Sequence, residues 1–246
     1  GMILITWGAT GGGGDWSKKG LEIRRSIDGG TTWSPSTSIA NPGWQAGGLT
    51  VDETSGDILA FVEHWEWPMP PPPPDIYRSS DHGKTWKIQK ALISGDSLGN
   101  IPSMHMAEHG ITLRNGRNAG RLLRAARFYA KEDRSSSFPQ HYNTAIFSDD
   151  GGTSWKTSTP FPAKGTGEGA IVELASGRVY YYSRRHWDPE GLRLMRWEAW
   201  SDDGGETWKD LSRSRILPDG SRGKGSNGCL GGLTRLPVNG RDIILY

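Results

Sequence analysis

Cysteine is scarce in this sequence, and long apolar runs and a large excess of either charge are missing. Its single cysteine, Cys229, excludes an internal disulfide framework and a cysteine-cluster metal site. No apolar run is long enough for a membrane-spanning helix, so no membrane segment is predicted. The formal net charge of +2 comes without a long basic run, which gives no support to a nucleic-acid partner. We expect no cofactor and no bound metal.

Glycine and tryptophan are abundant, with 35 and 12 copies in 246 residues, while hydrophobic residues make up only 34%. Helices disfavour glycine, and short strands joined by turns tolerate it better. The length allows one large all-β domain or two small domains. Because one repeat runs through the whole chain, we predict a single all-β domain over residues 1–246.

One motif, S-x-D-x-G-x-[TS]-W, occurs four times, and we name it the Asp box. The copies are SIDGGTTW, SSDHGKTW, SDDGGTSW and SDDGGETW, and their aspartates are Asp28, Asp81, Asp150 and Asp203. These aspartates lie 53, 69 and 53 residues apart. Repeats at this spacing indicate stacked supersecondary units, and the spacing is close to that of four-stranded propeller blades.

Each Asp box follows a short run with strand character: LEIRRS, DIYRSS, NTAIFS or RWEAWS. Aspartate and glycine supply the side-chain hydrogen bonds and backbone freedom of a tight turn, so the box is predicted to be a hairpin turn. A calcium loop is the alternative, but the box lacks the alternating carboxylates and closing glutamate of an EF-hand loop. We therefore assign the four aspartates a structural role.

A second hairpin precedes three of the boxes, as in AIVELASGRVYYYSR from Ala170. The repeating unit is then strand 1, polar turn, strand 2, connector, strand 3, Asp box and strand 4. GMILITW at the start matches strand 2 alone, and GLTRLPVNGRDIILY at the end matches strands 1 and 2 alone. We therefore expect about four to five blades of a β-propeller, incomplete at both ends.

Strand direction assigns the two faces of such a unit. Consecutive strands alternate in direction, so every Asp box lies on one face, the Asp-box face. The connectors between strands 2 and 3, and between units, lie on the opposite one, the connector face. Long loops on a repeating scaffold are where binding and catalysis concentrate, so we expect the site on the connector face.

Matched polar residues occupy this face in the aligned units. Glu108 and Glu168 come just before strand 1, and Arg127 and Arg184 lie near the end of strand 2. Asp15 lies in the first connector. Arginines grip a carboxylate bidentately and carboxyl groups do acid–base work, so the set suits the binding of an acidic sugar. For Glu108 and Arg127, a structural ion pair is the alternative.

His105, Glu108 and His109 have the H-x-x-E-H order of a zinc motif. That motif belongs on a helix, whereas here it leads directly into the strand-like GITL. We therefore favour a strand start without zinc.

The four Asp boxes, with GGGGDW before the first and EGAIVELASGRVYYYSRR before the fourth, resemble bacterial sialidases (neuraminidases) with BNR, or Asp-box, repeats. The resemblance covers essentially the whole chain. It implies a six-bladed β-propeller of four-stranded antiparallel blades that hydrolyses terminal α-linked sialic acid with retention. Such enzymes use three arginines for the substrate carboxylate, an aspartate acid/base, and a tyrosine nucleophile assisted by a glutamate.

The resemblance also implies residue roles. Asp15 matches the acid/base aspartate, and Glu168 matches the glutamate that activates the tyrosine. Arg184 matches the second arginine, with Arg185 as the alternative because the adjacent pair leaves the register open. A sialylated or other acidic glycan is the implied substrate. The implied location is extracellular or periplasmic, although no signal peptide is visible.

Other features of the family are not seen. The F/Y-R-I-P strand with the first arginine, the third arginine and the nucleophilic tyrosine are absent, and Tyr246 is not assigned that role. The region before Asp15 reads GATGGGGD, without the arginine that the family often has there. We therefore expect impaired sialidase activity in this chain. The alternatives are a non-catalytic Asp-box propeller that binds glycans or proteins, and a glycosidase that acts on a different sugar.

Overall fold

The computed structural model describes residues 1–10, 19–45, 47–63, 73–90, 92–104, 108–130, 139–185, 195–219 and 230–246. These residues form strands and turns, with one short 3-10 helix, Gly116–Asn118. Within these ranges, no helix has the length and apolar character needed to span a membrane. The all-β prediction is confirmed.

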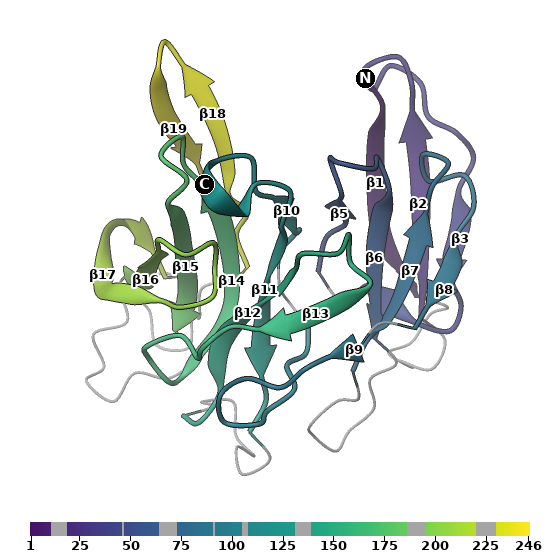
Figure 1. The fold of residues 1–246 in the computed structure, drawn as a ribbon. Helices are drawn as coiled ribbons and strands as arrows, with labels where there is room; N and C mark the ends of the chain where they lie inside the picture. The colour runs from purple at the N-terminus through teal and green to yellow at the C-terminus, as the bar shows by residue number, and fades with distance from the viewer. Residues whose placement is uncertain are drawn as a thin grey trace.

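Five sheets follow one another along the described chain (Figure 1). The first contains β1 (Ile3–Thr10), β2 (Lys19–Ser26) and β3 (Thr37–Ala40). The second contains β4 (Trp44–Gln45), β5 (Thr50–Val51), β6 (Ile58–Glu63), β7 (Asp75–Ser79) and β8 (Lys87–Gln89). The third contains β9 (Leu92–Ile93), β10 (Ile111–Thr112), β11 (Leu122–Phe128), β12 (Tyr142–Ser148) and β13 (Ser154–Thr157). The fourth contains β14 (Thr166–Glu173), β15 (Val179–Arg185), β16 (Met195–Ser201) and β17 (Lys209–Pro218), and the fifth contains β18 (Thr234–Val238) and β19 (Arg241–Leu245).

The predicted repeating unit is confirmed by the order of strands in each sheet. The fourth sheet runs β14-β15-β16-β17, which is strand 1 to strand 4, with antiparallel neighbours throughout. Two features were not predicted. Strand 1 of the second sheet is split into β4 and β5, which both pair with β6. The chain between β8 and β10 also lays β9 in parallel along the outer edge of β13.

Each Asp box forms the turn between strands 3 and 4, and the same set of internal hydrogen bonds closes every copy. The serine hydroxyl donates to the aspartate carboxylate at 2.6–2.8 Å and accepts the N–H of the box glycine at 2.8 Å. The aspartate also accepts the N–H of the threonine or serine before the tryptophan, at 2.9–3.0 Å. Backbone donors on both sides of the turn are thereby satisfied within the box.

The Asp boxes also join consecutive sheets. The glycines of three boxes pack against leucines at one register position of the preceding sheet, namely Gly83 on Leu4, Gly152 on Leu59 and Gly205 on Leu123. The box tryptophan enters the same junction: Trp155 is 1% exposed and meets Phe61 edge-to-face at 5.4 Å between ring centroids. Each of these three boxes is therefore both a turn of its own sheet and a contact with the sheet before it.

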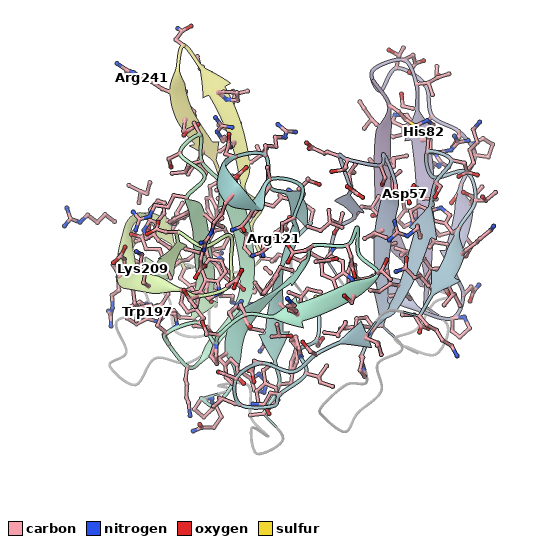
Figure 2. All side chains as sticks on the ribbon, in the orientation of Figure 1. Asp57, His82, Arg121, Trp197, Lys209 and Arg241 are labelled. Atoms are coloured by element: carbon pink, nitrogen blue, oxygen red, sulfur yellow. The ribbon has the colours of Figure 1, made fainter. Side chains whose placement is uncertain are left out.

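Arg121 adds a polar bond at the junction of the third and fourth sheets (Figure 2). Its Nε donates to Asp149 at 2.7 Å, and its Nη1 donates to Glu206 at 2.8 Å. The Arg121 side chain is only 6% exposed, although both carboxylates reach solvent. A buried guanidinium held by two carboxylates fixes the relative position of two Asp boxes.

Four apolar clusters fill the spaces between consecutive sheets. In one, Leu21 and Ile23 of β2 pack with Val62 of β6. In another, Phe147 of β12 packs with Tyr181 of β15. The other two clusters join the second sheet to the third, and the fourth to the fifth. The core is thus a series of sheet-to-sheet interfaces, as expected for stacked propeller blades.

The strand directions agree with the predicted assignment of faces. β11 and β15, the second strands of their units, both point downward in Figure 1, so the connector face lies at the bottom of that view and the Asp-box face at the top. The ends of β6, β11 and β15 consequently share the connector face.

Replacement of Gly152 by alanine tests the junction formed by the Asp box. A Cβ atom at Gly152 would lie 2.7 Å from Cδ1 of Leu59, and φ is +85°. We expect Gly152→Ala to lower the free energy of unfolding by about 2–4 kcal/mol, measured by urea denaturation. Gly30→Ala is the matched control, because φ is +92° but the new Cβ would meet nothing closer than 3.7 Å. Equal losses in both variants would show that the junction contributes nothing.

Acid titration tests the hydrogen bonds of the box aspartate. Burial acts to raise the pKa of Asp150, but hydrogen bonds from Ser154 and Ser148 outweigh it and lower the pKa to about 2. The stabilisation is therefore present above pH 3.8, the usual pKa, and is lost as the pH falls toward 2. We expect the difference in unfolding free energy between wild type and Asp150→Asn to shrink over this range. A difference that stays constant from pH 6 to about pH 2 would contradict the assignment.

Candidate functional site on the connector face

Three charged residues occupy one equivalent position at the ends of the second strands. Glu63, Arg127 and Arg184 each lie five residues after the strand residue that pairs with the serine of the following Asp box. The register thus agrees with the sequence alignment of Arg127 with Arg184 and adds Glu63 to the set. Glu63 and Arg127 are buried, whereas Arg184 is partly exposed.

Arg184 faces a β-bulge in the neighbouring strand. The pairing of β14 with β15 shifts register between Thr166 and Gly169, so that two residues of β14, one of them Glu168, oppose the single residue Arg184. Bulges re-aim side chains and are common beside active sites. Here Nη1 of Arg184 donates to Oε1 of Glu168 at 2.7 Å. The bulge therefore brings together two of the predicted site residues.

The residues on either side of Arg184 are anchored. The hydroxyl of Ser183 donates to Oδ1 of Asn143 in β12 at 2.8 Å. The backbone N–H of Arg185 donates to Oδ2 of Asp219, which follows β17, at 2.6 Å. Nε of Arg185 lies 3.8 Å from the same oxygen, and the Arg185 side chain is fully buried. Of the two adjacent arginines, Arg184 is the one that contacts Glu168.

Arg127 and Glu108 do not repeat this ion pair. Nη1 of Arg127 donates to Oη of Tyr129 at 3.1 Å, and Nη2 lies 2.9 Å from Nδ1 of His141. Burial and the neighbouring guanidinium lower the pKa of His141 to about 3, so its ring is neutral and Nδ1 accepts. The Glu108 carboxylate instead contacts Nδ1 of His109 at 3.3 Å. The alternative of an ion pair between Glu108 and Arg127 is therefore not what the described residues form.

A one-residue difference in register explains why Glu168 meets Arg184 whereas Glu108 does not meet Arg127. Counted from the pair nearest the hairpin turn, Glu108 is equivalent to Gly169 and not to Glu168. The N–H of Glu108 donates to the carbonyl of Gly169 itself, at 3.3 Å. Opposite Arg127, on the side away from β12, the described backbone partner is Ser103, and the Glu108 carboxylate does not meet the arginine.

Some of the predicted site falls outside the described residues. Asp15, the predicted acid/base, lies there, and so does His105 of the zinc motif. In the described ranges, no group of three or more His, Cys, Asp or Glu side chains is arranged to hold a metal ion. Asp15 therefore keeps its role as a prediction.

Several polar groups near the site were not predicted. Glu63 accepts a hydrogen bond from the hydroxyl of Ser103, at the start of the third unit. The guanidinium of Arg196 lies 4.7 Å from the ring centroid of Tyr182 and 5.3 Å from that of Tyr246. The register position could have identified Glu63, but no motif or spacing links Arg196 to the two tyrosines, or Asp219 to Arg185.

The buried tyrosines near these groups remain protonated. Burial raises the pKa of Tyr129, and nearby carboxylates add to this effect. Burial also raises the pKa of Tyr182, and the opposing effect of Arg196 is smaller. Neither phenol is activated as a nucleophile, because activation requires a lowered pKa or an adjacent general base.

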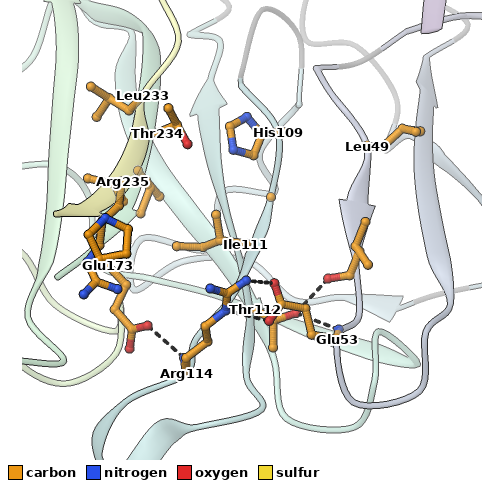
Figure 3. A pocket seen from close by; sticks show the side chains of 15 residues that line it. Leu49, Glu53, His109, Ile111, Thr112, Arg114, Glu173, Leu233, Thr234 and Arg235 are labelled. Carbon is orange, nitrogen blue, oxygen red and sulfur yellow. Dashed lines mark hydrogen bonds and ion pairs between the residues drawn. The ribbon is translucent and has the colours of Figure 1, made fainter. Parts of the chain in front are cut away.

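A cavity of about 310 Å³ lies along the inner strands, away from these residues (Figure 3). Its walls mix polar and charged side chains with the apolar side chains of Leu49, Val51, Ile111, Ile171, Val172, Leu233 and Pro237. Its charged groups bond to one another: Arg114 donates to both oxygens of Glu53 at 2.6 and 2.5 Å, and its N–H donates to Glu173 at 2.8 Å. None of the described site residues lines this cavity. His109, the neighbour of Glu108, does line it.

Known proteins resemble this chain in sequence and in fold. The sequence model of a protein family described as a BNR repeat-like domain matches residues 1–227. The structure of the Hadza microbial sialidase Hz136 matches with a TM-score of 0.72 and 21% identity, over 99% of this chain and 50% of that one. The intramolecular trans-sialidase from Ruminococcus gnavus, in complex with oseltamivir carboxylate, matches with a TM-score of 0.69 and 15% identity, over 99% and 73%.

A curated relative extends the comparison. A xyloglucanase from Paenibacillus sp is 25% identical over 225 residues, which cover 83% of this chain and 19% of that protein. The chain thus spans about half the length of the Hadza sialidase and about a fifth of the xyloglucanase. The likeness to the two solved structures establishes the fold, an all-β sialidase-type propeller architecture. With its Asp boxes and the match over residues 1–227, the chain belongs to the BNR repeat-like domain family.

Proposed function

We propose that this chain is part of a glycoside hydrolase of sialidase type, and that Arg184 binds the carboxylate of an acidic sugar on the connector face. The observation that carries the proposal is the ion pair of Arg184 with the buried Glu168 at the bulge of the fourth sheet. The sialidase-type fold supports it, as does the resemblance of the Glu168-to-Arg184 segment to the family motif.

The unequal exposure of the Glu168 and Arg184 side chains supports the assignment of ligand binding to Arg184. The Glu168 side chain is 1% exposed, whereas that of Arg184 is 13% exposed. Glu168 engages Nη1 of Arg184, and a guanidinium has five N–H donors in a planar fork. A ligand carboxylate then meets the exposed edge of a fork that Glu168 already holds in place, which reduces the entropy lost on binding.

Retaining hydrolysis of α-linked sialic acid is the finer proposal, for the whole protein. In it, Asp15 is the acid/base and Glu168 assists a tyrosine nucleophile. Tyr129 and Tyr182 do not suit that nucleophile role, because burial raises the pKa of both. Among the described residues, the proposal therefore assigns Arg184 to substrate binding and Glu168 to assistance of the reaction.

A neutral glucan is the second candidate ligand. The observation that favours it is the 25% identity to a xyloglucanase over 83% of this chain. Neutral sugars are bound without a carboxylate anchor, so an arginine on the connector face would then contribute little to affinity. The two candidates consequently differ in how binding responds to the loss of Arg184.

Calorimetric titration of this chain with 3′-sialyllactose, lactose and a xyloglucan oligosaccharide tests the proposal. We expect 3′-sialyllactose to bind at least about tenfold more tightly than lactose, because only the former carries a carboxylate. Arg184→Gln should weaken 3′-sialyllactose by about 10- to 100-fold, the range for a hydrogen bond to a charged group. Lactose affinity should change little.

Arg178→Gln is the matched control for this experiment. Arg178 also pairs with carboxylates, Asp202 and Asp210, but it lies at the start of β15, on the Asp-box face. We expect it to leave both affinities unchanged. Equal binding of 3′-sialyllactose and lactose would refute the acidic-sugar proposal. Selective binding of the xyloglucan oligosaccharide, unaffected by Arg184→Gln, would establish the second candidate instead.

A further inference from the structure

We infer that Asp219 is a positioning residue for Arg184, which fixes the end of β15 so that the Arg184 guanidinium faces the ligand with Glu168 behind it. The inference rests on the proposed function of Arg184 as the carboxylate anchor. Asp219 itself is 4% exposed and does not reach the surface where a sugar would bind.

The contact of Asp219 is with the backbone next to Arg184. Oδ2 of Asp219 accepts the N–H of Arg185 at 2.6 Å, and Nε of Arg185 lies 3.8 Å from the same oxygen. A carboxylate that accepts a main-chain N–H makes a short, charge-assisted bond. One side chain from the outer strand therefore holds the inner hairpin at the residue that follows the proposed anchor.

The bulge makes the bond between Arg185 and Asp219 important for the position of Arg184. Because two residues of β14 oppose Arg184, the regular ladder is interrupted at this position, and the backbone of Arg184 is not fixed by ladder pairing alone. The flanking bonds replace it: Ser183 donates to Asn143 on one side, and Arg185 donates to Asp219 on the other. Without the bond to Asp219, Arg185 is held in the described part of the sheet by its pairing with Thr166 alone.

The positive charges around Asp219 partly offset its burial. Burial raises the pKa of Asp219 above its usual value, and the Arg185 N–H and the guanidinium groups of Arg196, Arg185 and Arg184 act in the opposite direction without cancelling that rise. Arg196 is itself fixed nearby, since its Nε donates to the carbonyl of Pro218 at 3.1 Å. Arg184 is the most exposed of these three guanidinium groups.

Two substitutions separate positioning from simple stabilisation. Asp219→Ala removes the acceptor, whereas Asp219→Asn keeps an oxygen that can accept the N–H of Arg185 but removes the charge. Asp96→Ala is the matched control. Asp96 is also buried, at 8% exposure, and also accepts backbone N–H groups, but its partners are Leu98, Asn100 and Tyr142.

The first readout is independent of any sugar. In isotope-labelled protein, the Nε–Hε signal of Arg184 is assigned by its loss in Arg184→Lys. We expect its order parameter in Asp219→Ala to fall to below about 0.6, the range of flexible groups, and to recover in Asp219→Asn. Asp96→Ala should lower the melting temperature without this change. A rigid Arg184 signal in folded Asp219→Ala would overturn the inference.

The second readout is the affinity of folded protein for 3′-sialyllactose. We expect Asp219→Ala to weaken binding by about tenfold or more, Asp219→Asn to restore most of it, and Asp96→Ala to leave it unchanged. If wild type does not bind 3′-sialyllactose, the proposed function fails while the mobility result still decides the role of Asp219. If wild type binds and Asp219→Ala binds equally well, the positioning role fails and the proposed function stands.

Discussion

The Asp box, closed by its own hydrogen bonds and packed against the sheet before it, is the interaction on which the rest of the structure depends. Serine, aspartate and glycine satisfy the turn internally, so the box needs no metal or neighbouring chain to hold its shape. Its glycine then leaves room for a leucine of the preceding sheet, and its tryptophan fills the adjacent space, as Trp155 does beside Phe61. One motif thereby sets both the hairpin and the spacing between sheets.

This double role explains why so much of the fold could be predicted from the sequence. Four copies of one motif located strands 3 and 4, and the second hairpin upstream of three of them located strands 1 and 2. β4 and β9 escaped prediction, because strands of two residues are too short to have a periodic pattern. Their existence follows from tertiary pairing with β6 and β13, which sequence spacing does not encode.

The site was predictable only as far as the register is regular. The equivalence of Arg127 and Arg184 holds in the structure, because β11 pairs regularly with β12, and β15 pairs regularly with β16 as far as Ser183. Glu108 and Glu168 lie where strand 1 is irregular, and their positions in the register differ by one residue. As a result Glu168 meets Arg184, whereas Glu108 meets His109. The bond between Asp219 and Arg185 joins strands that are not neighbours in the sheet, so no local pattern indicates it.

The two faces of the molecule thus differ in how far they tolerate a departure from the regular structure. On the Asp-box face, each deviation meets a neighbouring sheet at close range, as a Cβ atom on Gly152 would meet Leu59. On the connector face, the bulge at Glu168 breaks the ladder at the end of a sheet, where an Arg184–Glu168 pair and two flanking bonds make up for the lost pairing. The connector face can therefore carry an irregular arrangement at the site, because the Asp boxes on the opposite face hold consecutive sheets together.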